Sequence, residues 1–170
     1  AEGNHRAAEA VFRSIIDRSG ESPDAVKAKG LLAGVLLANG DKPAAQALID
    51  QVLAGDQRNE QGLLLKASLA VDERKFDLAI ADLRTILRDS PNSPRALLML
   101  AKAHELAGAP ELAQENYQKA YEAGKPALQF GVAYAEFLLT RNQPARAEVV
   151  VSEVLQSEPA SVPAMRILAQ

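Results

Sequence analysis

The sequence repeats itself every thirty-four residues from Val26 to Gln170, and no insertion interrupts the register. Small and apolar residues mark the period in three series: Ala33, Ala67, Ala101 and Ala135; Ala45, Ala79, Ala113 and Ala147; Ile49, Leu83, Tyr117 and Val151. A period of this length indicates one supersecondary unit that cannot bury its apolar face alone. Stacking of successive units must therefore supply the hydrophobic core.

Within each unit the apolar residues follow a helical spacing in two segments that a turn separates. Leu32, Ala33 and Leu36 share one face of the first segment. Gly40 and Pro43 lie in the turn, where Gly can end one helix and Pro can begin the next. We expect helices at roughly 26–38, 43–54, 60–72, 76–88, 94–106, 110–122, 128–140 and 144–156. The predicted fold class is all-α, an α-solenoid of stacked antiparallel helix pairs.

The composition agrees with helix-on-helix packing. Hydrophobic residues make up 48% of the chain, but aromatic residues only 4%, which disfavours a β-sandwich. A net charge of -3 argues against a basic surface for nucleic acid. The absence of Cys excludes disulfides and thiol catalysis. The apolar stretch 30–40 is too short to span a bilayer, so we expect no membrane insertion of this segment.

Two short motifs are candidates for catalytic chemistry. His104 and Glu105 begin like a metalloprotease HExxH motif, but the fifth residue is Gly108 instead of a second His. In the stretch 19–24, Ser22 is predicted to be a helix N-cap and Pro23 the first helical residue, which is a structural role. We therefore predict no catalytic residue, no cofactor and no metal site.

The most highly charged stretch, 72–92, is predicted to be structural as well. Its apolar residues form the buried stripe of the helix 76–88. Its charged side chains lie off that stripe and are predicted to be solvated: Asp77, Asp82, Arg84 and Arg88.

A thirty-four-residue helix–turn–helix unit with alanine at positions 8 and 20 resembles the tetratricopeptide repeat, a family in which small residues occupy positions 8, 20 and 27. Pro91 and Pro159 match the family's proline at position 32. Four lysines depart from the pattern: Lys29 at position 4, Lys66 at position 7, Lys42 at position 17 and Lys125 at position 32. The resemblance implies a right-handed superhelix and repeats at 26–59, 60–93, 94–127 and 128–161.

Both ends of the chain resemble incomplete repeats. Ala8 and Phe12 mirror Ala79 and Leu83, so residues 1–25 resemble helix B, the second helix, of a preceding repeat. About three extra residues precede the repeat register there, in the stretch 20–25. Residues 162–170 resemble the start of helix A, the first helix, of a further repeat. We expect the chain to be an excerpt from a longer array.

The resemblance also implies where a partner would bind, since helix A lines a concave groove in this family. The family's lysine and asparagine clamp for a C-terminal carboxylate is absent, because Gly or Leu stands at most of its positions. The predicted groove is largely apolar with charges around it: Leu31, Leu64, Leu65, Ser68, Asp72, Arg95, Leu98, Met99, Lys102, Glu105, Val132 and Glu136. The alternative is that these leucines only support helix packing.

The predicted function is a non-catalytic scaffold whose groove binds a partner helix or peptide. The stretches "LANGD" and "AIADLRTILRDSPN" are similar to bacterial arrays of exopolysaccharide export and of exosortase-associated lipoproteins. That similarity implies a location in the bacterial periplasm or envelope. Two alternatives stay open: the region belongs to a larger enzyme such as a glycosyltransferase, or it is a self-associating module.

Overall fold

The computed structural model describes residues 2–125 and 127–169 of the chain, and it describes side chains from residue 7 onward. Ten helices and no strands occur in these residues. Their bounds are α1 Glu2–Ser19, α2 Pro23–Ala38, α3 Lys42–Gly55, α4 Glu60–Asp72, α5 Phe76–Asp89, α6 Pro94–Leu106, α7 Pro110–Gly124, α8 Leu128–Thr140, α9 Pro144–Ser157 and α10 Val162–Leu168. The predicted all-α fold is confirmed, and every helix that the period predicts is present.

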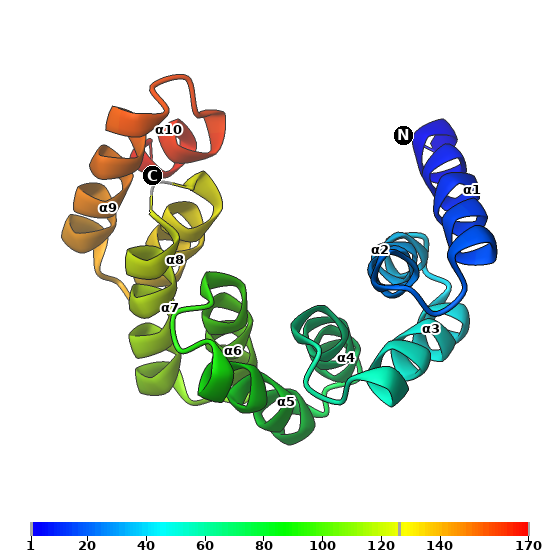
Figure 1. The fold of residues 1–170 in the computed structure, drawn as a ribbon. Helices are drawn as coiled ribbons and strands as arrows, with labels where there is room; N and C mark the ends of the chain where they lie inside the picture. Colours follow the sequence, from blue (N-terminus) through cyan, green and yellow to red (C-terminus); the bar gives the residue numbers. More distant parts are fainter. Residues whose placement is uncertain (1, 126, 170) are drawn as a thin grey trace. The chain divides into compact units, whose positions relative to one another are not determined.

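The chain divides into two compact units, Ala1–Ile86 and Leu87–Gln170. In the first unit, α1 packs on α2, and α2 packs on both α3 and α4 (Figure 1). A buried apolar cluster joins these helices: Leu32, Ala33, Leu36, Ala45, Ile49 and Leu69. The apolar stripe that the sequence predicts is therefore the core of this unit.

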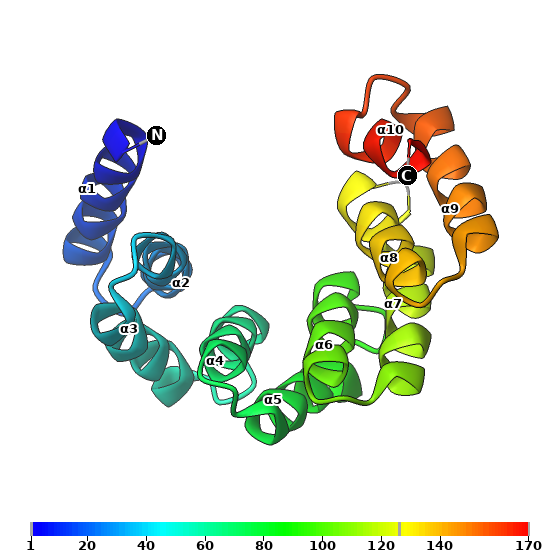
Figure 2. The same cartoon turned by 180° about the vertical axis from the view of Figure 1, so that it is seen from behind.

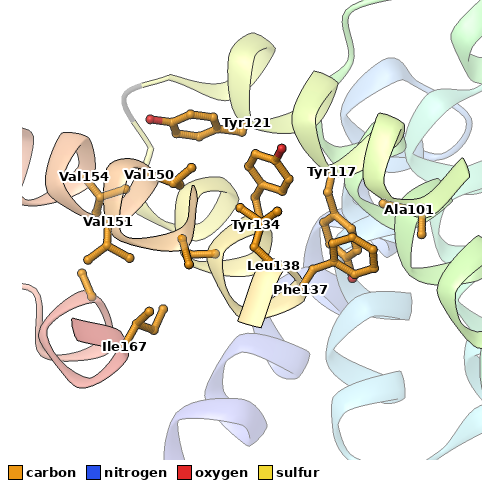
Figure 3. Close-up of a cluster of buried hydrophobic side chains, with 14 residues drawn as sticks. Ala101, Tyr117, Tyr121, Tyr134, Phe137, Leu138, Val150, Val151, Val154 and Ile167 are labelled. Carbon is orange, nitrogen blue, oxygen red and sulfur yellow. The ribbon is translucent and has the colours of Figure 1, made fainter. Parts of the chain in front are cut away.

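In the second unit, α7 packs between α6 and α8, and α9 packs on α8 (Figure 2). The short helix α10 contacts both α9 and α8. All three tyrosines of the chain belong to the core of this unit (Figure 3). The rings of Tyr117 and Phe137 stack with centroids 4.8 Å apart, and those of Tyr121 and Tyr134 are 6.1 Å apart. These rings fill volume that an alanine-rich interface would leave open.

A residue with left-handed backbone follows helix A in each of the four repeats. These residues are thirty-four apart: Gly40, Arg74, Gly108 and Asn142, with φ of 84°, 60°, 77° and 55°. In all four turns the next amide donates to the carbonyl five residues before it, at 2.8–2.9 Å. The predicted turn at Gly40 is confirmed. Arg and Asn adopt the same conformation in two repeats, although a side chain makes it less favourable there.

A second feature that recurs between the repeats is the N-cap of helix A. The side chains of Asn59, Ser93 and Ser161 each accept a hydrogen bond from the amide three residues later. Ala127 occupies the equivalent place before α8 and has no side chain that can cap. The equivalent amide of α8, that of Phe130, donates instead to the backbone carbonyl of Ala127 at 3.3 Å. The helices α4, α6 and α10 therefore have a side-chain cap that α8 lacks.

The first repeat begins differently from the others. Ser22 caps α2 and Pro23 is its first residue, as predicted. Because α2 starts at Pro23, three residues before the repeat register, the extra residues lengthen the helix instead of the loop.

The prediction that Asp82 is solvated is wrong. Its side chain is 16% exposed, and its Oδ1 lies 3.1 Å from Nζ of Lys66. The other oxygen, Oδ2, is buried and accepts no hydrogen bond from the described residues. Asp77, Arg84 and Arg88 keep contact with water, as predicted. The difference arises because α4 places a lysine beside Asp82, in a position where the other repeats have no cation.

Candidate protein-binding surfaces

In the first unit, the predicted binding residues lie on the helices α2 and α4, which contact each other. Leu31 of α2 is 41% exposed, whereas Leu64, Leu65 and Ser68 of α4 are half-buried or more. A Cβ on Gly30 would meet the Gln61 side chain at 2.6 Å, so glycine allows the two helices to approach closely. We call these two helix faces the α2–α4 surface.

Asp72 lies at the end of α4 and takes part in an ion pair. Its Oδ2 is 3.1 Å from Nζ of Lys42, the first residue of α3. Both side chains are about half exposed, so the pair contributes little to stability, on the order of 0–1 kcal/mol. Asp72 is therefore an accessible charge at the edge of the α2–α4 surface, with a cation beside it.

In the second unit, the predicted binding residues lie on α6 and α8, and we call these residues together the α6–α8 surface. Leu98 and Val132 are half-buried and pack against the buried cluster of this unit. Met99 is half-buried too. The charged residues of this set are on the whole more accessible, with Lys102 and Glu136 exposed and Glu105 half-buried. The apolar residues thus serve packing while keeping part of their area in water.

Arg95 of α6 is the remaining charged residue of the predicted set on the α6–α8 surface. It is the second residue of α6, directly after Pro94. Its position at the start of the helix puts a positive charge at the opposite end of α6 from Glu105. The α6–α8 surface therefore has charges of opposite sign at its two ends.

A buried tyrosine makes a hydrogen bond to one acidic residue of the α6–α8 surface. The Tyr117 hydroxyl donates to Oε2 of Glu105 at 2.7 Å. Burial of the ring, and then the charges of Glu105 and Glu136, raise the pKa of Tyr117 well above its usual range. The hydrogen bond holds the Glu105 carboxylate in place. The Glu105 carboxylate is therefore a fixed negative charge on this surface.

The structure also shows two cavities on helices to which the sequence assigned only a packing role. One, of about 440 Å³, is lined by Tyr121, Lys125, Ala127, Glu153, Val154, Gln156 and Ser157. The other, of about 670 Å³, is lined by Leu87, Pro91, Asn92, Leu97, Asn116, Lys119, Glu122 and Ala123. The departure of Lys125 from the repeat pattern is a sequence signal for the first cavity.

Two structural findings bear on catalysis and on membranes. The part of the chain that the structure describes holds no group of three or more side chains that could ligate a metal. Within the same residues, none of the helices combines the length and the apolar character that a bilayer crossing demands. His104 is 5% exposed and lies in α6.

Helix hairpins that recur every thirty-four residues, with the same turn after helix A, define a helical-repeat protein. Models of the tetratricopeptide repeat match residues 1–69 and 64–127. The chain belongs to the tetratricopeptide-repeat family, as the spacing of its small residues predicted. No curated protein matches the sequence significantly.

Solved structures share this fold at low sequence identity. A thermophilic tetratricopeptide-repeat protein of Thermus thermophilus is 18% identical, with a TM-score of 0.85 over 99% of this chain and 91% of that one. PilF of Pseudomonas aeruginosa is 18% identical, with a TM-score of 0.75 over 98% and 74%. A tetratricopeptide-repeat protein of Parabacteroides merdae is 17% identical, with a TM-score of 0.68 over 98% and 65%. These likenesses concern the fold.

Proposed function

We propose that the helix-A faces of this array bind an apolar segment of a partner protein. The observation that carries the proposal is the character of α2, whose residues 30–38 read GLLAGVLLA. This stretch has no charged side chain, yet Leu31 within it is 41% exposed. Burial of such surface against a partner removes it from water. Tetratricopeptide repeats are typically scaffolds for protein–protein interaction, and this chemistry suits such a scaffold.

The α6–α8 surface indicates which kind of partner segment would bind. Half-buried Leu98, Met99 and Val132 offer apolar area, and charges of both signs surround them. An amphipathic helix fits this arrangement, because its apolar face meets these side chains while its polar edges meet the surrounding charges. Exposed Lys102 and the fixed carboxylate of Glu105 favour a partner segment that carries both an acidic and a basic residue.

The proposal is tested with one charge substitution on each surface. Leu31→Glu changes the α2–α4 surface, and Met99→Glu changes the α6–α8 surface. Leu78→Glu is the matched control, because Leu78 is 59% exposed on α5, a helix B. Proteins captured from an envelope extract by the unmodified chain should be lost with a helix-A variant and kept with L78E. Capture of the same proteins by all three variants would refute the proposal.

We also propose that the partner belongs to a bacterial envelope assembly for exopolysaccharide secretion. The support is the similarity of "LANGD" and "AIADLRTILRDSPN" to arrays of that kind. Fractionation of cells that express the full-length protein tests the location, and recovery in the cytosol would contradict it. Sedimentation of the purified chain over a concentration range distinguishes partner binding from self-association.

A further inference from the structure

Two residues of the third repeat depart from the other repeats and lie in the same cavity. Tyr121 stands where the other three repeats have leucine: Leu53, Leu87 and Leu155. Lys125 stands where two repeats have proline. Both residues line the cavity of about 440 Å³, together with Glu153 from α9. A helix hairpin needs neither a tyrosine nor a lysine at these places, since its other copies fold without them.

These side chains form a compact arrangement around one oxygen. The Tyr121 hydroxyl donates to Oε2 of Glu153 at 2.5 Å, and Nζ of Lys125 donates to the same oxygen at 2.8 Å. The Lys125 ammonium also lies 4.4 Å from the centroid of the Tyr121 ring. An ammonium is thus held between an aromatic ring and a carboxylate, the two groups that proteins use to bind organic cations.

The tyrosine ring is held by the fold, whereas the lysine and the glutamate are both more accessible. Tyr121 is 8% exposed, and its ring lies beside Val150 and Val154 of α9 (Figure 3). Lys125 is the C-cap residue of α7, and its side chain is 47% exposed. The Glu153 side chain is also 47% exposed, but the Tyr121 hydroxyl holds one of its oxygens by a hydrogen bond. The ring and this carboxylate therefore form a cation site, and Lys125 is a tethered cation that can leave it.

The surroundings of the site also favour positive charge. The last turn of α9 ends at the cavity and contains no basic residue. A helix C-terminus carries partial negative charge, so it attracts a cation. The hydrogen bonds from Tyr121 and Lys125 both reach Oε2 of Glu153, so neither of them occupies Oε1. Val154 and Ala127 add apolar wall that the methylene stem of a long side chain can cover.

We propose that this cavity binds the arginine or lysine side chain of a basic protein segment, and that Lys125 is its internal competitor. The incoming guanidinium or ammonium takes the place of the Lys125 ammonium against Glu153 and the Tyr121 ring. The site lies on α7 and α9, which are B helices, so it is distinct from the helix-A surfaces. It does not rest on the proposed function, because neither the α2–α4 nor the α6–α8 surface contributes a residue.

Two other lysines that depart from the repeat pattern show how Lys125 and Glu153 differ from an ordinary ion pair. Lys42 pairs with Asp72 and Lys66 pairs with Asp82. Neither of these lysines is seen over an aromatic ring of the described residues, whereas Lys125 lies over that of Tyr121. Lys125 combines an ion pair, an aromatic face and an adjoining cavity, which are the features of a binding site.

The test uses peptide probes and variants of the whole chain. The probe is acetyl-Ala-Arg-Ala-amide, and its matched control replaces arginine with citrulline, which has nearly the same shape but no charge. Lys125→Met removes the competitor and keeps its apolar stem, so arginine-probe affinity should rise about tenfold over the unmodified chain. Glu153→Gln should abolish binding in both backgrounds. Lys119→Met breaks another lysine–glutamate pair of α7 and should change nothing.

Binding is followed by NMR titration of the Tyr121 ring protons, which report the site directly. The proposal is supported if K125M binds the arginine probe more tightly than the unmodified chain and ignores the citrulline probe. It is overturned if K125M binds no more tightly, or if citrulline binds as well as arginine. Binding that survives E153Q would place the probe elsewhere and would equally overturn it. These outcomes are independent of partner capture by the helix-A surfaces.

Discussion

The ammonium of Lys66 lies 3.1 Å from Oδ1 of Asp82, where the first repeat has Leu32 and Leu48 in its apolar cluster. A charge pair has thus replaced an apolar pair at the same two positions of the repeat. The replacement is incomplete, because Oδ2 of Asp82 is buried without a hydrogen bond from the described residues. Such a pair has a desolvation cost that its mutual attraction only partly offsets.

The first prediction concerns this pair. Lys66→Leu combined with Asp82→Leu should leave the free energy of unfolding unchanged or raise it by about 1 kcal/mol. The two leucines would reproduce the packing that Leu32 and Leu48 give to the first repeat. Urea denaturation followed by circular dichroism measures the change.

The single variants of the pair are the controls. Lys66→Leu alone should cost about 2 kcal/mol, because it leaves a carboxylate with 16% exposure and no partner. Asp82→Leu alone should cost less, since the Lys66 side chain is 45% exposed and water can solvate it. A double variant that is less stable than either single variant would contradict the argument.

The second prediction concerns the close approach of α8 to its neighbours. A Cβ on Gly131 would overlap with Cγ2 of Val154 and would lie 3.3 Å from Cε2 of Tyr121. Both neighbours are buried, so the core must shift to accept the methyl group. Gly131→Ala should therefore destabilise the protein by roughly 1–3 kcal/mol, measured by thermal and urea unfolding.

Gly55→Ala is the matched control for that substitution. Gly55 is the last residue of α3, and no atom lies within 4 Å of the place its Cβ would take. Alanine there should be neutral or stabilising by up to about 1 kcal/mol. Equal effects of the two substitutions would show that Gly131 is not a packing residue.

Much of the fold could be predicted from the sequence because the repeats can be aligned with one another. Ala79 and Ala113 occupy one position in successive units, so a single alignment assigns every helix and turn. The side-chain partners could not be predicted in this way. Asp82 lies sixteen residues from Lys66, and Glu153 lies twenty-eight from Lys125, so each pair joins two helices whose rotations only packing determines. The period indicates which position is unusual, but it does not indicate what lies opposite.

For the predicted binding residues too, the repeat period does not predict how neighbouring helices cover each side chain. The sequence assigned Leu65 and Leu98 to helix A and to its groove face, but it could not distinguish an exposed leucine from a packing leucine. In the structure both are half-buried, because neighbouring helices cover part of each side chain. Leu31 of α2 is more exposed, at 41%.

The third prediction concerns the missing cap of α8. Asn59, Ser93 and Ser161 cap the other helices at this position of the repeat, and Ala127 does not. Ala127→Ser should stabilise the protein by about 1 kcal/mol, because its hydroxyl can accept an amide donor at the start of the helix. Ser93→Ala is the converse control: it removes an existing cap and should lower the free energy of unfolding by a similar amount. A gain from A127S smaller than the error of urea denaturation would count against the cap.

The fourth prediction concerns alkaline pH. Burial and the charges of Glu105 and Glu136 raise the pKa of Tyr117 above the value of about 10 that tyrosine has in an unfolded chain. A raised pKa means that the folded state favours the neutral phenol. This contribution is therefore complete below pH 10 and is lost as the pH rises above it. Burial also raises the pKa of Tyr121, to about 12, so the unmodified protein should lose stability steadily above pH 10.

The Tyr117→Phe variant measures how much of this loss of stability above pH 10 comes from Tyr117. At pH 8 the variant should be less stable by about 1 kcal/mol, because it lacks the hydrogen bond to Glu105. Above pH 10 its stability should fall less steeply than that of the unmodified protein, by up to about 1.4 kcal/mol per pH unit. The two curves of unfolding free energy against pH should therefore converge between pH 10 and 11. Parallel curves, measured by urea denaturation from pH 8 to 11, would show that Tyr117 ionises as readily in the folded protein as in the unfolded chain.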